Sequence, residues 1–174
     1  MKNILFVLAL SITCYTSAQK KQAVKKDKYG NLIGYVKKSA FLDKSYSQWF
    51  TKNYDSYKTE EAIIDKIRKK INKCKIAGFM GTWCGDSRRE VPKLYKVLEQ
   101  VDFNMDNLEM VALDRSKRTP DNLQKGYNIV RIPTFVFYKN GKEIGRFVEY
   151  SRETLERDIL KILTTKSYKH SYQK

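Results

Sequence analysis

Runs of apolar residues and apolar residues at helical spacing predict a series of strands and helices over residues 59–165. The unbroken apolar runs at 76–82 and 108–113 are typical of buried strands. Spacings of three and four predict three helices, with Thr59 as N-cap of the first, Cys84 directly before the second and Ser151 as N-cap of the third. The apolar faces of these helices contain Ile63, Ile64, Ile67 and Ile71; Val91, Leu94, Val97, Leu98 and Val101; and Leu155, Ile159, Ile162 and Leu163.

The second half of this region carries a hairpin signal. Residues 134–138 and 143–148 flank Asn140-Gly141, a dipeptide that favours a two-residue β-turn. Thr119-Pro120 combines a capping residue with a proline and predicts the start of a short helix. Helices and strands that alternate and then end in a hairpin predict an α/β fold. Its central mixed β-sheet is parallel in the first part, antiparallel at one edge and covered by helices on both faces.

Residues 19–58 precede this region as an N-terminal extension. A short hairpin is expected around Gly30-Asn31. Residues 45–57 place aromatic side chains close to helical spacing and predict a helix, which either packs on the main core or forms a surface for a partner. At the other end, residues 166–174 form a polar, basic tail that is expected to be disordered.

The first 18 residues have the pattern of a secretory signal peptide. Lys2 precedes an apolar stretch at residues 4–12, and Thr16-Ser17-Ala18 supplies small residues at the usual cleavage spacing. A membrane anchor would need about 20 apolar residues, and lipid modification of Cys14 is disfavoured by the residues before it. We therefore expect cleavage near Ala18 and an exported, soluble protein, with the periplasm as its location.

Charge narrows the range of partners. The chain has 35 Lys and Arg against 19 Asp and Glu, a formal net charge of +16, so its surface favours acidic partners in general. The basic residues are spread over helix faces and both ends, and they form no stripe interleaved with stacking aromatics. A solvated basic surface is the simpler interpretation, and no nucleic acid is expected as a partner.

Cys84 is the candidate nucleophile because it stands between a buried strand and a helix. The free N–H groups and the dipole at a helix N-terminus favour the thiolate, and Arg88 and Arg89 act in the same direction. Asp86 would oppose them if its carboxylate faced the sulfur. Ser87 occupies the place of the second cysteine of a C-x-x-C pair and is expected to donate a hydrogen bond to the thiolate.

Cys74 is a poor partner for Cys84. The two cysteines flank a strand of about seven residues, which separates them by about 23 Å. A disulfide needs Cα atoms within about 7 Å. Cys74 is therefore expected to be a small buried residue at the far end of the strand.

With these residues the sequence resembles the thioredoxin superfamily over residues 59–165. Trp83-Cys84-Gly85 matches the active-site signature up to its second cysteine, and Pro92 falls where the family has a helix-kinking proline. Residues 127–141 match the segment that holds the family's cis-proline and the following hairpin. The resemblance implies a thioredoxin-like fold in which Pro133 is cis and lies beside the sulfur. It also implies substrate contacts from Trp83, Gly85, Asp86, Ile132 and Pro133.

Three departures from the family pattern affect the expected chemistry. Ser87 removes the resolving thiol, so Cys84 cannot close a disulfide with its neighbour. Gly78 and Met110 stand where the family has a buried Asp and its partnering Lys, which removes the usual internal proton acceptor. Glu149-Tyr150 replaces a glycine turn beside the substrate, which predicts a different substrate preference.

These features predict an exported thiol–disulfide oxidoreductase that acts through one cysteine, with Cys84 and Ser87 as catalytic residues. Its expected partners are protein thiols and disulfides or a low-molecular-weight thiol, with no cofactor and no metal. The competing interpretation is a non-catalytic or client-trapping binding module, and a redox-inert scaffold also stays open. A peroxide-reducing cysteine is disfavoured, because Ala77 and Gly81 occupy the places of the Pro and Thr, respectively, that are expected upstream of such a cysteine.

Overall fold

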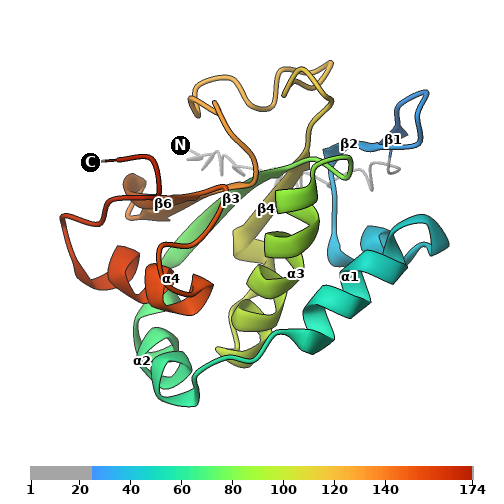
Figure 1. The fold of residues 1–174 in the computed structure, drawn as a ribbon. Coiled ribbons are helices and arrows are strands. Elements are labelled where there is room, and N and C mark those ends of the chain that lie inside the picture. Colours follow the sequence, from blue (N-terminus) through green and yellow to red (C-terminus); the bar gives the residue numbers. More distant parts are fainter. Residues whose placement is uncertain (1–24, 174) are drawn as a thin grey trace, which may run out of the picture.

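The computed structural model describes residues 25–173 and contains one six-stranded mixed sheet (Figure 1). The strands follow the order β1-β2-β4-β3-β5-β6. β3 and β4 are parallel, and the other neighbouring pairs are antiparallel. The strands are β1 (Lys25–Lys26), β2 (Leu32–Tyr35), β3 (Cys74–Met80), β4 (Leu108–Ala112), β5 (Thr134–Lys139) and β6 (Lys142–Val148).

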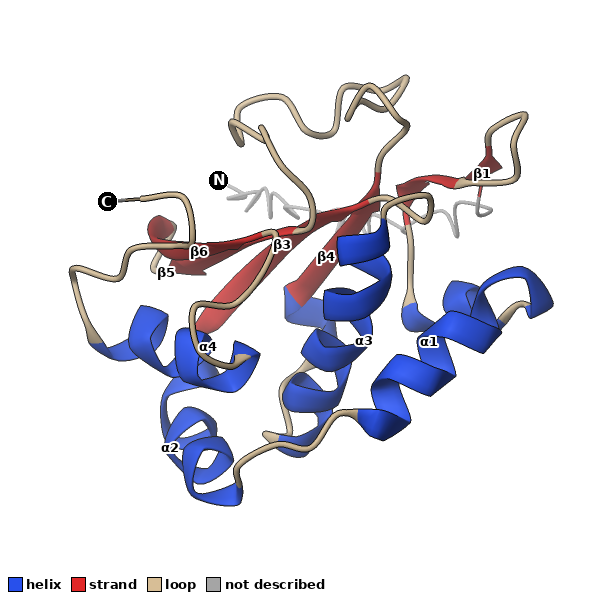
Figure 2. Cartoon of the chain, viewed as in Figure 1, coloured by secondary structure: helices blue, strands red, loops and turns tan. Residues whose placement is uncertain are grey.

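All the α-helices lie on one face of the sheet (Figure 2). They are α1 (Lys44–Ser56), α2 (Glu61–Ile71), α3 (Gly85–Gln100) and α4 (Leu155–Thr164), with 3-10 turns η1 (Lys38–Leu42) and η2 (Met105–Asn107). The α/β class and the mixed sheet are confirmed. The expectation of helices on both faces is corrected, because the buried side chains of all four helices belong to a single core cluster on one side of the sheet.

The opposite face is covered by the loop between β4 and β5. Leu123, Tyr127 and Ile129 of this loop pack on a second apolar cluster that includes Phe79, Val111 and Val136. The short helix expected at Thr119-Pro120 is absent from this described loop. Thr119 Oγ accepts from the backbone of Leu123 at 2.9 Å and closes one turn, but Asn122, Gly126 and Asn128 adopt positive φ, which ends any helical run.

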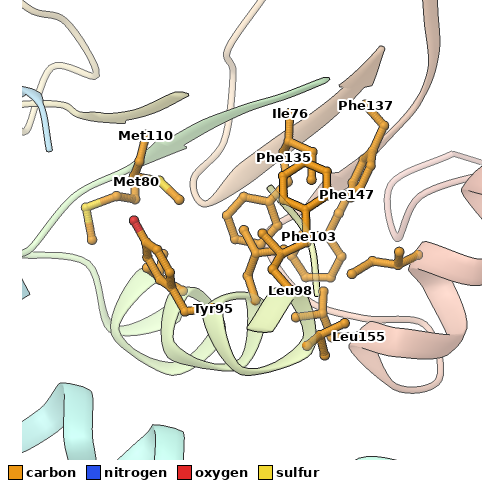
Figure 3. Close-up of a cluster of buried hydrophobic side chains, with 14 of the residues drawn as sticks. Ile76, Met80, Tyr95, Leu98, Phe103, Met110, Phe135, Phe137, Phe147 and Leu155 are labelled. Atoms are coloured by element: carbon orange, nitrogen blue, oxygen red, sulfur yellow. The ribbon is translucent and has the colours of Figure 1, made fainter. Parts of the chain in front are cut away.

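The main core lies between the sheet and the helices (Figure 3). The side of β3 that carries Ile76 and Met80 faces α3, and Phe135, Phe137 and Phe147 of β5 and β6 extend the same layer toward α4. Pro92 lies inside α3, as the sequence match requires. The hairpin at Asn140-Gly141 is confirmed, with φ of 52° and 74° at these two residues, as a type I′ turn requires.

Two helix starts differ from the sequence prediction. The N-cap of α2 is Glu60, because the hydroxyl of Thr59 is directed to Gln100 at 2.8 Å. The N-cap of α4 is Thr154, whose hydroxyl accepts from the backbone of Arg157 at 3.4 Å, so the cap lies three residues after the predicted one at Ser151. A tertiary contact diverts Thr59 from capping, whereas at α4 a local hydrogen bond selects among neighbouring residues that could all cap a helix.

The N-terminal extension is part of the core. β1 and β2 form the expected hairpin, and β2 pairs with β4 at Gly34 and Tyr35. α1 packs on α3, where Phe50 stacks on Phe41 with ring centroids 5.3 Å apart and meets Tyr95 edge-on at 5.8 Å. The aromatic stripe therefore packs on the main core.

The tail beyond α4 is ordered against the sheet edge, which corrects the expectation of disorder. Ser171 Oγ donates to Val148 O at 2.6 Å, and Tyr172 hydrogen-bonds to Glu149. Short polar side chains in the tail thus find partners at the end of β6. The interpretation of residues 1–18 as a signal peptide, and Cys14, lie outside the described residues.

Within residues 25–173, no helix combines the length and the apolar character that crossing a membrane requires.

Removing the Phe50 ring should destabilise the whole domain, since the ring is 2 % exposed and connects the extension to α3. Phe50→Ala is expected to lower the free energy of unfolding by about 3–5 kcal/mol in denaturant titrations. The matched control is Leu42→Ala in the same extension, which is 58 % exposed and should change stability by about 0.5 kcal/mol or less. Equal effects of the two substitutions would show that the extension is not part of the core.

Candidate functional site

Cys84 is the N-cap residue of α3. Its backbone is extended, with φ −88° and ψ 126°, and its carbonyl accepts the first helical hydrogen bond from Arg88 N at 3.0 Å. The turn that leads into the helix is closed by Cys84 N, which donates to Gly81 O at 3.0 Å. The thiol is half-buried and stands at the positive end of the helix dipole, as the sequence predicts.

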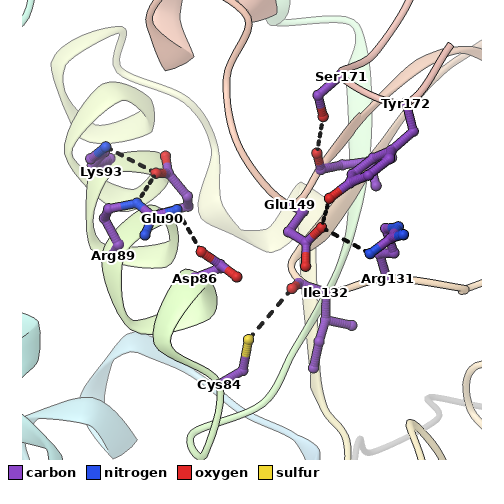
Figure 4. Close-up of polar contacts among 11 residues, drawn as sticks. Cys84, Asp86, Arg89, Glu90, Lys93, Arg131, Ile132, Glu149, Ser171 and Tyr172 are labelled. Atoms are coloured by element: carbon purple, nitrogen blue, oxygen red, sulfur yellow. Dashed lines mark hydrogen bonds and ion pairs between the residues drawn. The ribbon is translucent and has the colours of Figure 1, made fainter.

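The sulfur lies against the loop that precedes β5 (Figure 4). Cys84 Sγ donates to Ile132 O at 3.5 Å, and the Ile132–Pro133 peptide bond is cis. Ile132 and Pro133 are both buried, and Cys84 packs on the apolar cluster to which Ile132 belongs. The cysteine and the proline loop are 48 residues apart in sequence, and the sheet brings them together as predicted.

Ser87 is fully buried beneath this junction. Its Oγ accepts a hydrogen bond from Gly81 N at 3.2 Å. Within residues 25–173 no hydrogen bond joins Ser87 to Cys84, so the expected donation to the sulfur is not observed. Ser87 instead fixes the turn that carries Cys84, because Gly81 N and Gly81 O are both engaged across it.

The charged residues of the first turns pair with one another along α3 (Figure 4). Arg89 contacts Asp86 at 2.6 Å and Glu90 at 2.8 Å, and Lys93 contacts the same Glu90 carboxylate at 3.0 Å. The Asp86 charge is therefore balanced by Arg89. Arg88 donates through Nε to Thr82 O at 2.6 Å. Neither arginine contacts the sulfur, because Arg88 is engaged with Thr82 O and Arg89 with Asp86 and Glu90.

Glu90 was not singled out from the sequence. It is 2 % exposed, and one of its carboxylate oxygens has no partner among the described residues. A charged residue at a core-facing helical position was the available signal. Its two cationic neighbours on α3 compensate the buried charge.

Trp83 and Gly85 flank Cys84 in different ways. The Trp83 indole donates to Leu113 O at 2.9 Å, and the Arg115 guanidinium lies over its ring at 5.4 Å. A Cβ at Gly81 would come within 2.7 Å of this indole, which explains the glycine there. Gly85 is exposed, with nothing within 4 Å of a Cβ placed on it, so it leaves the surface beside the thiol open.

The extension also supports the site through Thr82, which the sequence did not single out. Leu32 N of β2 donates to Thr82 Oγ at 3.1 Å, and the hydroxyl is directed to the Asn31 amide oxygen at 3.5 Å. Thr82 is 1 % exposed and lies two residues before Cys84. The hairpin of the extension therefore anchors the turn that carries the thiol.

A thioether occupies the space beneath the site where the resemblance implies an acid. A Cβ at Gly78 would lie 2.7 Å from Met110 Cε and 2.8 Å from its Sδ. Gly78 and Met110 are direct neighbours in the parallel pairing of β3 and β4. The Met110 side chain thus fills the space of the missing side chain, and neither residue can accept a proton.

Cys74 lies at the opposite end of β3 and is buried. Burial raises the pKa of its thiol, which makes the thiolate less accessible at neutral pH. Both cysteines of the described part of the chain are free thiols. The expectation that they do not pair is confirmed.

Residues 36–161 match the family model described as thioredoxin. The chain is 35% identical over 84 residues to the chloroplastic thioredoxin Y of Oryza sativa subsp. japonica, covering 48% of this chain and 47% of that protein. It is 33% identical over 94 residues to thioredoxin H2 of Arabidopsis thaliana, covering 54% and 66%. These relatives are therefore matched over about half to two thirds of their own length.

Among solved structures, a protein of unknown function from Pseudomonas aeruginosa is similar in fold. The two chains superpose with a TM-score of 0.55 at 15% identity, covering 72% of this chain and 89% of that one. At this identity the likeness concerns the fold alone.

The two thiols should differ sharply in reactivity toward iodoacetamide. Cys84 is half-buried at a helix N-terminus, whereas Cys74 is 1 % exposed with a raised pKa. We expect mass spectrometry of the native protein to show alkylation at Cys84 and protection of Cys74 until denaturant is added. Comparable native rates at the two residues would contradict the placement of Cys84 at the surface.

Restoring an acid at position 78 should destabilise the protein. Gly78→Asp brings a carboxylate against the Met110 thioether and is expected to lower the free energy of unfolding by about 2–4 kcal/mol. Adding Met110→Lys supplies a partner charge and should recover part of this loss. Gly78→Ala is the control, because only the flexible end of Met110 must move. Wild-type stability of Gly78→Asp would mean that the space is not filled.

Proposed function

Because this chain belongs to the thioredoxin family, we propose that it is an exported thiol–disulfide oxidoreductase that works through a single nucleophilic cysteine, Cys84. The observation that carries the proposal is the position of the Cys84 thiol. It stands at the N-terminus of α3 and 3.5 Å from Ile132 O, on the loop that holds the cis-proline. A sulfur at this point can meet an extended disulfide substrate laid along the proline loop.

In the first step the Cys84 thiolate attacks one sulfur of a disulfide. A new bond forms between Cys84 Sγ and that sulfur, the substrate S–S bond breaks, and the second substrate sulfur leaves as a thiolate. The leaving thiolate takes its proton from solvent, because Gly78 and Met110 provide no acid beneath the site. The product is a mixed disulfide on Cys84.

The second step requires a thiol from outside the chain. Ser87 holds the place of a resolving cysteine, and Cys74 is buried at the other end of β3. An external thiolate attacks the mixed disulfide and releases Cys84 as a thiolate, so the external thiol is oxidised as the substrate is reduced or rearranged. Protein disulfides and low-molecular-weight thiols are the proposed partners.

Export is a separate part of the proposal. It rests on the signal-like pattern of residues 1–18, with cleavage near Ala18 and the periplasm as destination. Disulfide exchange suits such an oxidising compartment. Trp83, Gly85, Asp86, Ile132 and Pro133 are proposed as the residues that contact the substrate. The first three adjoin Cys84 in the chain, and the last two form the cis dipeptide whose Ile132 carbonyl accepts from the thiol.

The activity should require Cys84 and an added thiol. With excess 2-mercaptoethanol and a peptide that carries a mixed disulfide, we expect wild-type protein to accelerate thiol release, and Cys84→Ser to abolish the acceleration. Cys74→Ser should retain it, because Cys74 is remote from the site. The measurement is the rate of release with and without protein.

The same assay separates this function from its alternative. If wild-type protein shows no turnover but forms stable mixed disulfides with clients, it is a client-trapping module. Ser87→Cys tests the single-thiol mechanism, because a second cysteine at this position should trap Cys84 in an internal disulfide and remove the need for the added thiol in the release of the first substrate. An unchanged thiol requirement in Ser87→Cys would contradict the role assigned to position 87.

A further inference from the structure

A cluster of polar and aromatic side chains from three separate segments lies beside the proline loop. Arg131 precedes the cis-proline pair, Glu149 follows β6, and Tyr172 belongs to the C-terminal tail. Arg131 contacts Glu149 at 3.3 Å, the Tyr172 hydroxyl donates to the same carboxylate, and the Arg131 guanidinium lies 4.0 Å from the centroid of the Tyr172 ring. These three residues are called the tail wall below.

The tail wall adjoins the backbone that faces the thiol (Figure 4). Arg131 is the neighbour of Ile132, whose carbonyl is 3.5 Å from Cys84 Sγ. Glu149 N donates to Pro133 O at 2.7 Å, which joins the end of β6 to the other side of the same dipeptide. A substrate chain laid along Ile132 therefore runs past Arg131, Glu149 and Tyr172.

The tail is held in this position by more than one contact. Ser171 Oγ donates to Val148 O at 2.6 Å, and the Tyr150 ring meets Tyr172 edge-on at 5.6 Å. Glu149 has φ of 66°, a conformation that costs a non-glycine residue energy and is maintained here by its backbone and side-chain partners. Its carboxylate thus points toward the tail.

The wall is attached by contacts that can open. Tyr172 is 41 % exposed and Arg131 is exposed, so polar and cation–π contacts hold the Tyr172 side chain more than apolar burial does. The hydrogen bond to Glu149 raises the pKa of Tyr172 to about 12, which keeps the phenol protonated as a donor over the neutral range. Titration of this phenol therefore plays no part in the contact near neutral pH.

We propose that the tail wall determines which disulfides reach Cys84, admitting small or slender thiol-bearing molecules and limiting bulky folded proteins. Tyr172 and Glu149 are specificity-determining residues in this assignment, and neither takes part in the exchange of sulfur bonds. A substrate with a narrow profile passes along Ile132 with the tail in place. A wide one must first displace Tyr172 from Arg131. Selection among disulfide substrates presupposes the oxidoreductase function proposed above, so this role of the tail wall depends on that function.

Access to the sulfur can be measured without turnover. Cys84 in the full chain is allowed to react with N-ethylmaleimide and, separately, with a maleimide attached to a folded carrier protein. Tyr172→Ala should raise the ratio of the bulky rate to the small rate by about three- to tenfold, as expected when one cation–π contact and one hydrogen bond to a charged group keep the wall closed. Tyr172→Phe retains the ring over Arg131 but not the hydrogen bond and should fall between.

The matched control is Tyr29→Ala. Tyr29 is 72 % exposed and lies between β1 and β2, at the opposite edge of the sheet from β6. It should leave the ratio unchanged. An unchanged ratio in Tyr172→Ala overturns the proposal. So does an equal rise with both maleimides, because that would place the effect on the reactivity of the sulfur and not on access.

Disulfide turnover distinguishes failure of the wall from failure of the proposed function. With bis(2-hydroxyethyl) disulfide as the small substrate and insulin as the folded one, Tyr172→Ala should increase turnover of insulin alone. If wild type turns over neither substrate while the maleimide ratio shifts as expected, the wall limits access and the oxidoreductase function fails. If both substrates turn over and Tyr172→Ala changes neither their ratio nor the maleimide ratio, the function stands and the wall fails.

Discussion

Packing of α3 between the sheet and α1 fixes where the thiol of Cys84 stands. Val91, Leu94 and Leu98 bury one face of the helix against the sheet, and the ring of Tyr95 enters the aromatic cluster formed with Phe50. With the helix axis fixed on two sides, its N-terminus has one position relative to β5. The sulfur then meets Ile132 O at 3.5 Å without any covalent constraint between the two segments. Tertiary packing therefore determines the position of the free thiol, and the helix N-terminus determines the electrostatic environment of its sulfur.

The features that could be predicted from the sequence are those set by local pattern. The order of strand, cysteine and helix predicted Cys84 as a helix cap, and Asn140-Gly141 predicted the hairpin between β5 and β6. Both predictions succeeded because each feature depends on residues only a few positions apart. The N-caps at Glu60 and Thr154 could not be predicted because several adjacent residues can cap a helix. The contact of Thr59 with Gln100 and the hydrogen bond from Arg157 N to Thr154 decide among them. The short helix predicted at Thr119-Pro120 does not form, because Asn122 and Asn128 adopt a positive φ that the sequence pattern does not reveal. The ordered tail depends on Val148 and Glu149, which are remote in sequence from Ser171 and Tyr172.

Gly78 and Met110 stand where the family resemblance implies a buried Asp and its Lys partner. This difference changes which polar partners the site needs in the core. A buried carboxylate would need a partner and would carry a desolvation cost. The thioether fills the same space without either. This arrangement avoids the desolvation cost of a buried acid. In the proposed mechanism, proton transfer then involves solvent at the surface of Cys84. The exposed backbone at Gly85 leaves that surface open to water. The loss of the acid and the openness of the thiol are thus compatible with each other.

Because position 87 carries no resolving thiol, the proposed reaction depends on how easily a second molecule reaches Cys84. In a dithiol site the second cysteine attacks the mixed disulfide from within, so the surroundings need admit only one molecule. Here the buried Ser87 hydroxyl accepts from Gly81 N. In the proposed mechanism the mixed disulfide therefore persists until a second molecule reaches Cys84 Sγ. That molecule must approach while the first is still attached. The surface is open at Gly85, and Arg131, Glu149 and Tyr172 contact one another next to the Ile132 backbone. If Cys84 acts as proposed, the shape of this surface influences whether an incoming thiol reaches the mixed disulfide, and so whether the client is exchanged or trapped.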